Sequence, residues 1–328
     1  MSTSLSRALD AVLDGLPAEA LRRATATLIE VYRSGGPPTE QVLRDPVTAA
    51  AYAAYRMPAT HAAVARALRH ATDLVDPADL GVRSLVDLGG GTGAATWAAA
   101  EAFDGLESAT VLDGSSDALA IGRRVGRHGP PPVASATWER RLITADVAVP
   151  QADLVTVSYV LGELDETLHA AVVDAATRAA RHVLVIEPGT PRGYAAVLAA
   201  RDRLVALGWH VLAPCPQEGP CPVAARAGDW CHFSVRLDRS GLHRRVKAGA
   251  LGYEDEKFSY VVASREPVPR AAGRVLRHPV SRKGLVQLEV CDTRGSAGRV
   301  VVTRSDRLAY RSARDASWGD AWPPSRPG

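Results

Sequence analysis

Four cysteines are the first residues of this 328-residue chain whose spacing points to chemistry. Cys215, Cys221 and Cys231 lie within "CPQEGPCPVAARAGDWC", and Cys291 lies in "LEVCDTRG". Four thiols are what a tetrahedral zinc site or an iron–sulfur cluster requires. The C-x2-C pairs typical of zinc knuckles are absent, whereas the proline after Cys215 and after Cys221 favours an iron–sulfur ligand loop. We therefore predict an iron–sulfur site, with zinc, His232 as a substitute ligand, and inert buried thiols as the alternatives.

A glycine-rich turn predicts a second site. In "LVDLGGGTGAATWAAA" an apolar run ends at Asp87 and is followed by Gly89, Gly91 and Gly93 before an alanine-rich helix. Glycines are needed there because a Cβ would block a ligand from the backbone at the carboxyl edge of a parallel sheet. We expect Asp87 and the three glycines to hold part of a cofactor.

Two further acids follow the next predicted strands. Asp113 in "TVLDGSSD" could accept hydrogen bonds from a ribose, and Asp146 in "LITADVAVP" could reach an adenine amino group. Acids after three successive strands resemble the S-adenosylmethionine site of class I methyltransferases. Nucleoside triphosphate is disfavoured because the Walker lysine is absent, and NAD because G-x-G-x-x-G is matched only with Ala94 in the last place.

Candidates for catalysis lie after the predicted fourth strand, in "SYVLGEL". Methyl transfer needs alignment and, for some acceptors, a base, so Ser158, Tyr159 and Glu163 are the residues that could touch a substrate. The Asn/Asp-Pro-Pro-aromatic motif of many base-methylating enzymes is missing at this position. Glu187 and Arg192, after the fifth strand, are predicted at the rim of the cleft.

The elements that must position these residues follow from apolar periodicity. Residues 1–78 predict a helical N-terminal region. In residues 79–270 short apolar runs alternate with alanine-rich stretches, which predicts a doubly wound α/β domain with a cysteine-containing insert at 214–256. Residues 275–328, with short strands and glycine turns, predict a small β-rich, basic domain.

Composition excludes several classes of protein. Hydrophobic residues make up 46% of the chain and charged residues 23%, as in globular rather than disordered proteins. No run approaches the roughly 20 apolar residues of a membrane span, and the N-terminus lacks the apolar run of a secretory signal. We therefore expect no membrane contact, a cytoplasmic location and a monomer.

Charge is distributed unevenly along the chain. Residues 231–328 carry 19 Lys and Arg against 10 Asp and Glu, whereas the preceding residues carry 20 against 26. A basic C-terminal part predicts an anionic partner, with nucleic acid as the leading candidate and a solvated basic surface as the alternative. The acidic "YEDEK" (253–257) is expected to pair with basic neighbours. The predicted phosphate contacts are Arg236, Arg239, His243, Arg244, Arg245, Lys247, Arg282, Lys283, Arg304, Arg307, Arg311 and Arg314.

Several segments together resemble the methyltransferase-like assembly factors of the mitochondrial small ribosomal subunit and their bacterial relatives. They are "VDLGGGTGAA", "CPQEGPCP", "DWCHFSVRLDRSGLHRRVK", "YEDEKFSYVVASR" and "YRSARDASWGD", and the resemblance covers most of the chain from about residue 50. It implies a class I S-adenosylmethionine-dependent methyltransferase (Rossmann-like) fold and association with small-subunit rRNA. It also implies a [4Fe-4S] cluster on Cys215, Cys221, Cys231 and Cys291.

Two functions are compatible with this sequence. One is an rRNA methyltransferase of the small subunit, and the other is a non-catalytic RNA-binding assembly factor with a retained cofactor pocket. Three of the cysteines lie in the insert and Cys291 lies in the C-terminal domain. A cluster on all four would therefore join the two regions, and we predict that its role is chiefly structural.

Overall fold

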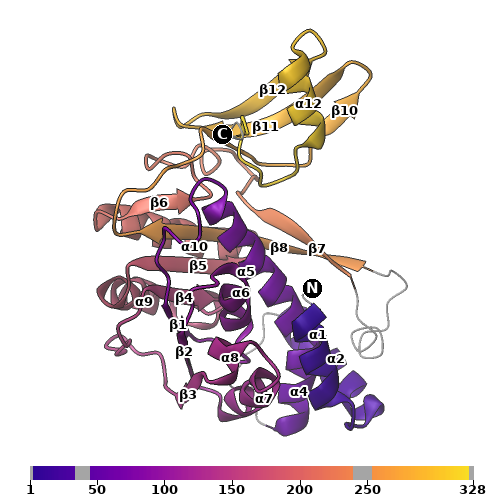
Figure 1. Ribbon diagram of the computed structural model, residues 1–328, viewed down its shortest axis with the longest axis vertical. Helices are drawn as coiled ribbons and strands as arrows, with labels where there is room; N and C mark the ends of the chain where they lie inside the picture. Colours follow the sequence, from indigo (N-terminus) through magenta and orange to yellow (C-terminus); the bar gives the residue numbers. More distant parts are fainter. Residues whose placement is uncertain (1–2, 34–44, 239–252, 325–328) are drawn as a thin grey trace.

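A computed structural model describes residues 3–33, 45–238 and 253–324 of the chain (Figure 1). Its main sheet has the strand order β3-β2-β1-β4-β5-β8-β6. The strands are β1 (Ser84–Leu88), β2 (Ser108–Asp113), β3 (Thr137–Arg140), β4 (Leu154–Ser158), β5 (His182–Pro188), β6 (His210–Ala213), β7 (Phe233–Asp238) and β8 (Tyr253–Ser264). Strand β8 is antiparallel to both β5 and β6, and β7 pairs with its first half. Parallel strands with one antiparallel strand inserted before the last are the arrangement of class I methyltransferases, which confirms the predicted fold class.

Helices cover both faces of the main sheet (Figure 1). One face packs against α5 (Met57–Thr72) and α6 (Ala94–Ala102), and the other against α9 (Glu166–Ala179) and α10 (Pro191–Ala206). The remaining helical elements of this domain are α7 (Ser116–Gly126), α8 (Pro131–Ala134) and the 3-10 turn η1 (Leu161–Glu163). Every residue of β4 is buried, as expected of a strand that helices cover on both faces.

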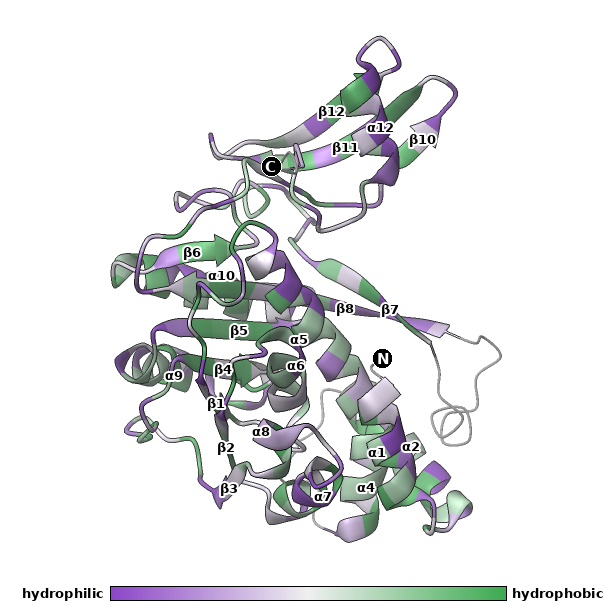
Figure 2. Cartoon of the chain, in the orientation of Figure 1, coloured by the Kyte–Doolittle hydropathy of each residue, from purple (hydrophilic) through white to green (hydrophobic). Residues whose placement is uncertain are grey.

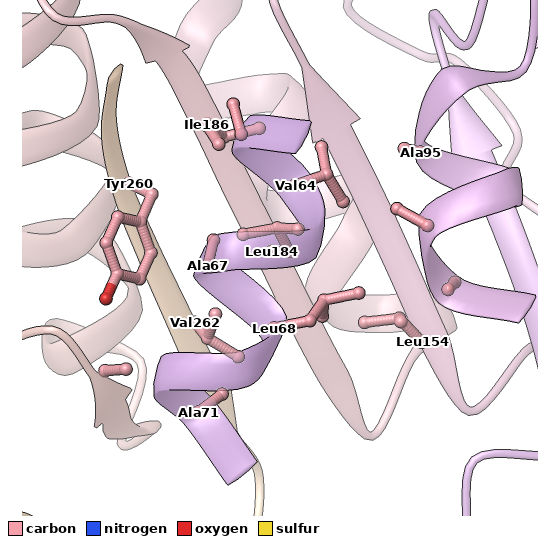
Figure 3. Packing of buried hydrophobic residues seen from close by; sticks show 14 of the residues in the cluster. Val64, Ala67, Leu68, Ala71, Ala95, Leu154, Leu184, Ile186, Tyr260 and Val262 are labelled. Atoms are coloured by element: carbon pink, nitrogen blue, oxygen red, sulfur yellow. The ribbon is translucent and has the colours of Figure 1, made fainter. Parts of the chain in front are cut away.

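Helix α5 belongs to the main core. Leu68 packs with Leu154 and Leu184 of the sheet, and the small side chains of Ala67 and Ala71 let the helix lie close to it (Figure 3). The boundary predicted at residues 78 and 79 therefore does not separate two cores, because α5 forms a layer of the methyltransferase-like domain.

The N-terminal residues are helical, as predicted. Helices α1 (Thr3–Leu13), α2 (Ala18–Arg33) and α4 (Pro46–Tyr55) pack around Trp97 of α6 and against α7. Asp45 caps α4 by accepting hydrogen bonds from the backbone N–H groups of the first turn, and a proline at the helix start needs no such partner. Within the described part of the chain, no helix has both the length and the apolar character to cross a bilayer.

The C-terminal unit is a small antiparallel sheet with one helix (Figure 1). Its elements are β9 (Gly273–Val275), β10 (Val280–Arg282), β11 (Leu285–Asp292), β12 (Ala297–Thr303) and α12 (Arg307–Asp315). Side chains alternate across β11, so that Val286 and Leu288 face Ala313 of α12 while the intervening residues are more exposed. The β-rich region thus begins at Gly273, two residues earlier than predicted.

The end of the described chain returns to the main body. The Trp318 indole is buried in the core formed by α5, α6 and the sheet, and its Nε1–H donates to the carbonyl of His232 at 2.9 Å. The backbone of Gly319 donates to Val275 O, and that of Trp322 to Gly273 O. At the other end of the unit, Arg274 of β9 donates to the Pro214 carbonyl at 3.2 Å and pairs with Asp73 at 3.1 Å, so the C-terminal unit is anchored to the main body at both of its ends.

Candidate cofactor cavity and cysteine site

A cavity of about 370 Å³ opens at the carboxyl ends of β1, β2 and β4. This is the edge of a doubly wound sheet at which ligands bind, and the volume is within the range of small-molecule sites. It is lined by Tyr52, Met57, Thr60, Gly89, Gly90, Gly91, Thr92, Ala94, Ala95, Asp113, Gly114, Ala118, Leu142, Ile143, Thr144, Ser158, Tyr159, Val160, Glu163, Leu164 and Asp165. The walls combine aliphatic side chains with backbone and a few polar groups.

The glycine turn after β1 forms one wall of the cavity. Gly89 has a φ of +72° and Gly91 a φ of +52°, a region of backbone conformation that glycine adopts without steric cost. A Cβ on Gly89 would lie 2.1 Å from Cγ2 of Val160, so this residue also allows the turn to pack against the segment after β4. The two glycines line the cavity as predicted for a backbone cradle.

Asp113 lies at the end of β2 and faces the cavity. Its Oδ2 accepts a hydrogen bond from the Gly91 N–H at 2.9 Å, and its Oδ1 accepts one from the Ser115 N–H at 2.8 Å. The carboxylate is thereby fixed in orientation. This is the geometry expected of a group that binds vicinal hydroxyls.

Asp87 does not line the cavity, contrary to its predicted role in cofactor binding. It is fully buried beneath the glycine turn, where it accepts hydrogen bonds from the N–H and hydroxyl of Thr96 and from the hydroxyl of Thr156. Burial raises its pKa to about 6, and the hydrogen bonds oppose that shift. Asp87 therefore supports the turn from below by joining β1, β4 and the start of α6.

Gly93 and Asp146 also lie off the cavity lining. Gly93 packs directly against the Trp138 ring. A Cβ at this position would lie 2.6 Å from that ring, so only glycine fits there. Asp146 is fully exposed and accepts a hydrogen bond from the Thr144 hydroxyl at 2.7 Å. The third strand ends at Arg140, earlier than the sequence indicated, so Asp146 lies in the following loop and Thr144 lines the cavity instead.

All three candidate catalytic residues line the cavity. The Ser158 hydroxyl is buried and has no hydrogen-bond partner among the described residues, so a ligand atom could supply one. Tyr159 has a φ of +59°, an unusual conformation for a bulky residue and the only non-glycine case within the described ranges. Backbone strain of this kind persists where surrounding contacts fix it.

Those contacts come from distant parts of the chain. The Tyr159 hydroxyl donates to Oε1 of Glu256 at 2.9 Å, and Arg56 pairs with the same oxygen at 3.1 Å. The Arg56 guanidinium also lies 5.3 Å from the centre of the Tyr159 ring. This network fixes the side chain of Tyr159, which lines the cavity, and engages its hydroxyl. The sequence offered no local signal for it.

Glu187 is buried behind the same wall rather than at the rim of the cleft. Its carboxylate accepts hydrogen bonds from the N–H groups of Val160 and Leu161 at 2.9 and 2.8 Å and from that of Gly162 at 3.2 Å. Burial raises the Glu187 pKa to about 7, against these three bonds. The residue therefore fixes the backbone that follows Tyr159.

The four cysteines come from three segments and converge at the junction of the two sheets. Cys215 and Cys221 follow β6, Cys231 precedes β7, and Cys291 lies on β11. Cys221, Cys231 and Cys291 pack around the same apolar side chains. Burial raises the pKa of Cys231 well above its usual value, and the charges of the other three cysteines raise it further. The structure thus brings all four predicted ligands together.

All four thiols are free. Within the described ranges, no group of three or more His, Cys, Asp or Glu side chains is arranged to hold a single metal ion. The His232 ring stacks on Trp230, and its Nδ1 lies 3.1 Å from the Trp230 carbonyl.

Arginines also connect the insert to the C-terminal unit. Arg226 pairs with Glu289 of β11 and donates to the carbonyl of Ala297. Arg277 pairs with Asp229. The four cysteines are therefore part of a larger polar interface between the insert and the small sheet.

The predicted basic surface is described only in part. Arg236 pairs with Asp255 at 2.9 Å, which confirms one pairing expected of the acidic run. Exposed basic residues of the C-terminal unit give it hydrophilic surfaces (Figure 2). They include Arg282, Lys283, Arg299, Arg304, Arg307, Arg311 and Arg314. Arg239, His243, Arg244, Arg245 and Lys247 lie outside the described residues.

Sequence comparison places the chain in a family. The family described as mitochondrial small ribosomal subunit Rsm22 matches residues 46–323, which include the glycine turn, the cavity and all four cysteines. The chain belongs to the Rsm22 family. This confirms the resemblance drawn from the sequence motifs.

Curated relatives of this Rsm22 family member are mitochondrial in name. The human ribosome assembly protein METTL17, mitochondrial, is 30% identical over 292 residues, which are 83% of this chain and 62% of that protein. The Rsm22-cox11 tandem protein 2, mitochondrial, of Schizosaccharomyces pombe is 26% identical over 182 residues, 43% of this chain and 24% of that one. The chain thus spans less than two thirds of either relative. The cytoplasmic location predicted from the N-terminal sequence is contradicted, because the family and these relatives all carry mitochondrial descriptions.

Solved structures similar to this Rsm22 family member include two methyltransferases. Magnesium protoporphyrin IX methyltransferase from Synechocystis PCC 6803 is 17% identical, with a TM-score of 0.36, and the match covers 60% of this chain and 76% of that one. An O-methyltransferase family 2 protein from Planctomyces limnophilus is 15% identical, with a TM-score of 0.36 and coverage of 56% and 50%.

Proposed function

We propose that this chain is an assembly factor of the small ribosomal subunit that binds S-adenosylmethionine in its cavity and a [4Fe-4S] cluster on its four cysteines. The observation that carries the proposal is that one Rsm22-type chain combines both sites with an exposed basic unit. The cysteines lie where that unit joins the main domain. The cluster would therefore hold in place a basic surface that could bind RNA phosphates.

S-adenosylmethionine fits the residues that line the cavity. Asp113, already oriented by two backbone N–H groups, would accept hydrogen bonds from the ribose hydroxyls. Gly91 leaves open the space that a side chain would enter, and the unpartnered Ser158 hydroxyl would gain a partner. When bound, this cofactor supplies an activated methyl group. The protein residues contribute binding and exclusion of water.

The cysteine site suits a cluster better than a single ion. Four thiols converge from three segments, and the buried guanidinium of Arg201 lies beside them with an Nε that has no partner among the described residues. A buried donor of this kind calls for an acceptor, and thiolate or sulfide sulfur is one. Cys215, Cys221, Cys231 and Cys291 would be the ligands.

RNA is the partner that the charges favour. The exposed arginines of the C-terminal unit include Arg307, Arg311 and Arg314, which recur at helical spacing along α12. Guanidinium groups bind phosphate in a bidentate manner, so several such contacts would make binding to ribosomal particles decrease steeply with salt.

Methylation of rRNA is the second candidate function, and Ser158 and Glu163 favour it. Both line the cavity at the carboxyl end of β4, where an acceptor atom would approach the methyl group. Two observations argue for the non-catalytic alternative. The Tyr159 hydroxyl is already hydrogen-bonded to Glu256, and the Asn/Asp-Pro-Pro-aromatic motif of base-methylating enzymes is missing.

Cofactor binding is tested by calorimetry with S-adenosylmethionine. We expect Asp113→Ala to weaken binding about 10-fold to 100-fold, because the ribose contacts are lost. Asp146→Ala is the matched control, since this exposed acid lies off the cavity, and it should bind as the parent does. Equal binding by all three proteins would refute the proposed pose.

Activity is tested with radiolabelled S-adenosylmethionine and small-subunit particles from a strain that lacks this gene. The anaerobically purified parent protein and Asp113→Ala are compared at equal particle occupancy. Label in rRNA that depends on Asp113 would establish the methyltransferase. No label, together with salt-sensitive particle binding and rescue of subunit assembly by the parent, would establish the non-catalytic factor. Failure to bind particles at all would refute both.

A further inference from the structure

Helix α10 faces the cysteine site with two polar side chains that the proposed function does not use. Tyr194 and Arg201 are seven residues apart, two helical turns, and therefore lie on the same face of the helix. The Tyr194 hydroxyl donates to Sγ of Cys221 at 3.3 Å. A phenol is thus in hydrogen-bond contact with one predicted ligand sulfur.

Arg201 contacts the backbone of the loop that joins the first two cysteines. Its Nη2 donates to the carbonyls of Gln217 at 3.0 Å and Gly219 at 2.8 Å, both between Cys215 and Cys221. Only 4% of its side chain is exposed. A buried arginine is expensive to desolvate, and its single carboxylate partner, Asp202, lies at 2.6 Å but is largely exposed.

The negative charge of the proposed cluster would also need nearby positive charge or hydrogen-bond donors. A [4Fe-4S] cluster with four thiolates is an anion, and hydrogen bonds and charges near its sulfurs set its reduction potential. The Nε of Arg201 is buried and has no hydrogen-bond partner among the described residues, and a ligand sulfur could accept its hydrogen bond. The helix therefore offers positive charge on the Cys215 side and a hydroxyl on the Cys221 side.

We infer that Tyr194 and Arg201 are positioning residues for the cluster: they hold the Cys215–Cys221 loop and, by donating to its sulfurs, raise the reduction potential of the cluster. This inference rests on the proposed [4Fe-4S] site. Reduction adds one electron to the cluster and makes it more negative, so nearby donors stabilise the reduced form more than the oxidised form.

The test is a potentiometric titration of the anaerobically purified full-length protein with dithionite, followed by electron paramagnetic resonance. Arg201→Gln is expected to lower the equilibrium constant for reduction about tenfold, which is about 59 mV for a one-electron couple. Tyr194→Phe, which removes only the hydroxyl, is expected to lower it about threefold. Arg203→Gln is the matched control, because this arginine lies on the same helix but pairs with Asp174 away from the cysteines, and it should leave the potential unchanged.

Iron content separates the possible outcomes. A parent protein without iron would refute the proposed cluster, and this inference with it. Fully loaded variants with the parent potential would overturn the inference alone and leave the cluster in place. If Arg201→Gln fails to bind iron, Tyr194→Phe decides, since it keeps the ring and the fold: a lowered potential supports the inference and an unchanged one overturns it.

Discussion

The cofactor cavity and the cysteine site are built by different means. The cavity lies where three strands of one sheet end, and buried groups such as Asp87 and Glu187 fix its walls from behind. The cysteine site lies between two sheets and is held by arginine pairs such as Arg226 with Glu289. The first is shaped by packing before any ligand arrives, whereas the second depends on polar contacts and on what the thiols bind. Ligand removal should therefore affect the two regions unequally.

The largest effect is expected from Cys291→Ser, which removes the ligand supplied by the C-terminal unit. We expect loss of iron and a decrease in the free energy of unfolding of roughly 4 kcal/mol, the contribution of a ligand present at a thousand times its dissociation constant. Limited proteolysis should then cleave residues 273–316 faster, with apo parent protein as the control. Full iron content together with unchanged protease resistance would contradict a structural role for the cluster.

The cavity should be most sensitive to substitutions that disturb the backbone of its glycine turn. Gly89→Ala is expected to destabilise the fold by roughly 2–4 kcal/mol and to abolish S-adenosylmethionine binding, because the new methyl group would meet Val160. Gly228 has the same φ of +72° but open space around it, so Gly228→Ala should cost only about 1 kcal/mol. Chemical denaturation measures both, and equal losses would show that packing against Val160 is unimportant.

The pH dependence of stability should originate in the main domain. Glu187 has a folded pKa of about 7 against an ordinary value of 4.5, so the folded state binds the proton more tightly than the unfolded state. Stability should therefore fall as pH rises from about 4.5 to 7, by roughly 1–3 kcal/mol from this group. Glu187→Gln should flatten that slope, whereas Glu166→Gln, at an exposed position, should not. An unchanged slope in Glu187→Gln would contradict the assignment.

The smallest effect concerns the arginine pairs of the interface. Arg226→Gln should loosen the C-terminal unit by about 1 kcal/mol, since the pair is only partly shielded from water. Arg294→Gln is the control, because this arginine is 85% exposed in its pair with Asp292 and should have an effect near zero. Hydrogen exchange of β11 reports the difference, and faster exchange in Arg294→Gln than in Arg226→Gln would reverse the expected order.

Much of the fold could be predicted because buried parallel strands read as apolar runs. Strands β1, β2, β4 and β5 were all expected from such runs, whereas β7 and the charged first half of β8 were not. The residues of "YEDEK" pair with β7, and their charges are satisfied by side chains such as Arg236. A charged strand of this kind contains no apolar run from which it could be predicted.

Only those residues of the candidate site that directly follow a recognisable strand could be predicted from the sequence. Asp113 follows its strand directly and was found, while Asp146 was misplaced because the third strand ends earlier than the sequence indicated. The contact of Tyr159 with Glu256 joins residues 97 positions apart, and that of Arg56 with Glu256 joins residues 200 apart. Such contacts depend on the strand order, which no short motif contains.

The return of the chain through Trp318 has a consequence for the proposed cluster. Because Arg274 of β9 and Trp318 after α12 both bond to the main body, the C-terminal unit would remain tethered at two points if the cluster were lost. Cys291 would then stay at a high effective concentration near the other three thiols, so that reassembly would be an intramolecular event. We therefore expect the cysteine site to recover on resupply of iron and sulfide without refolding of the rest of the chain.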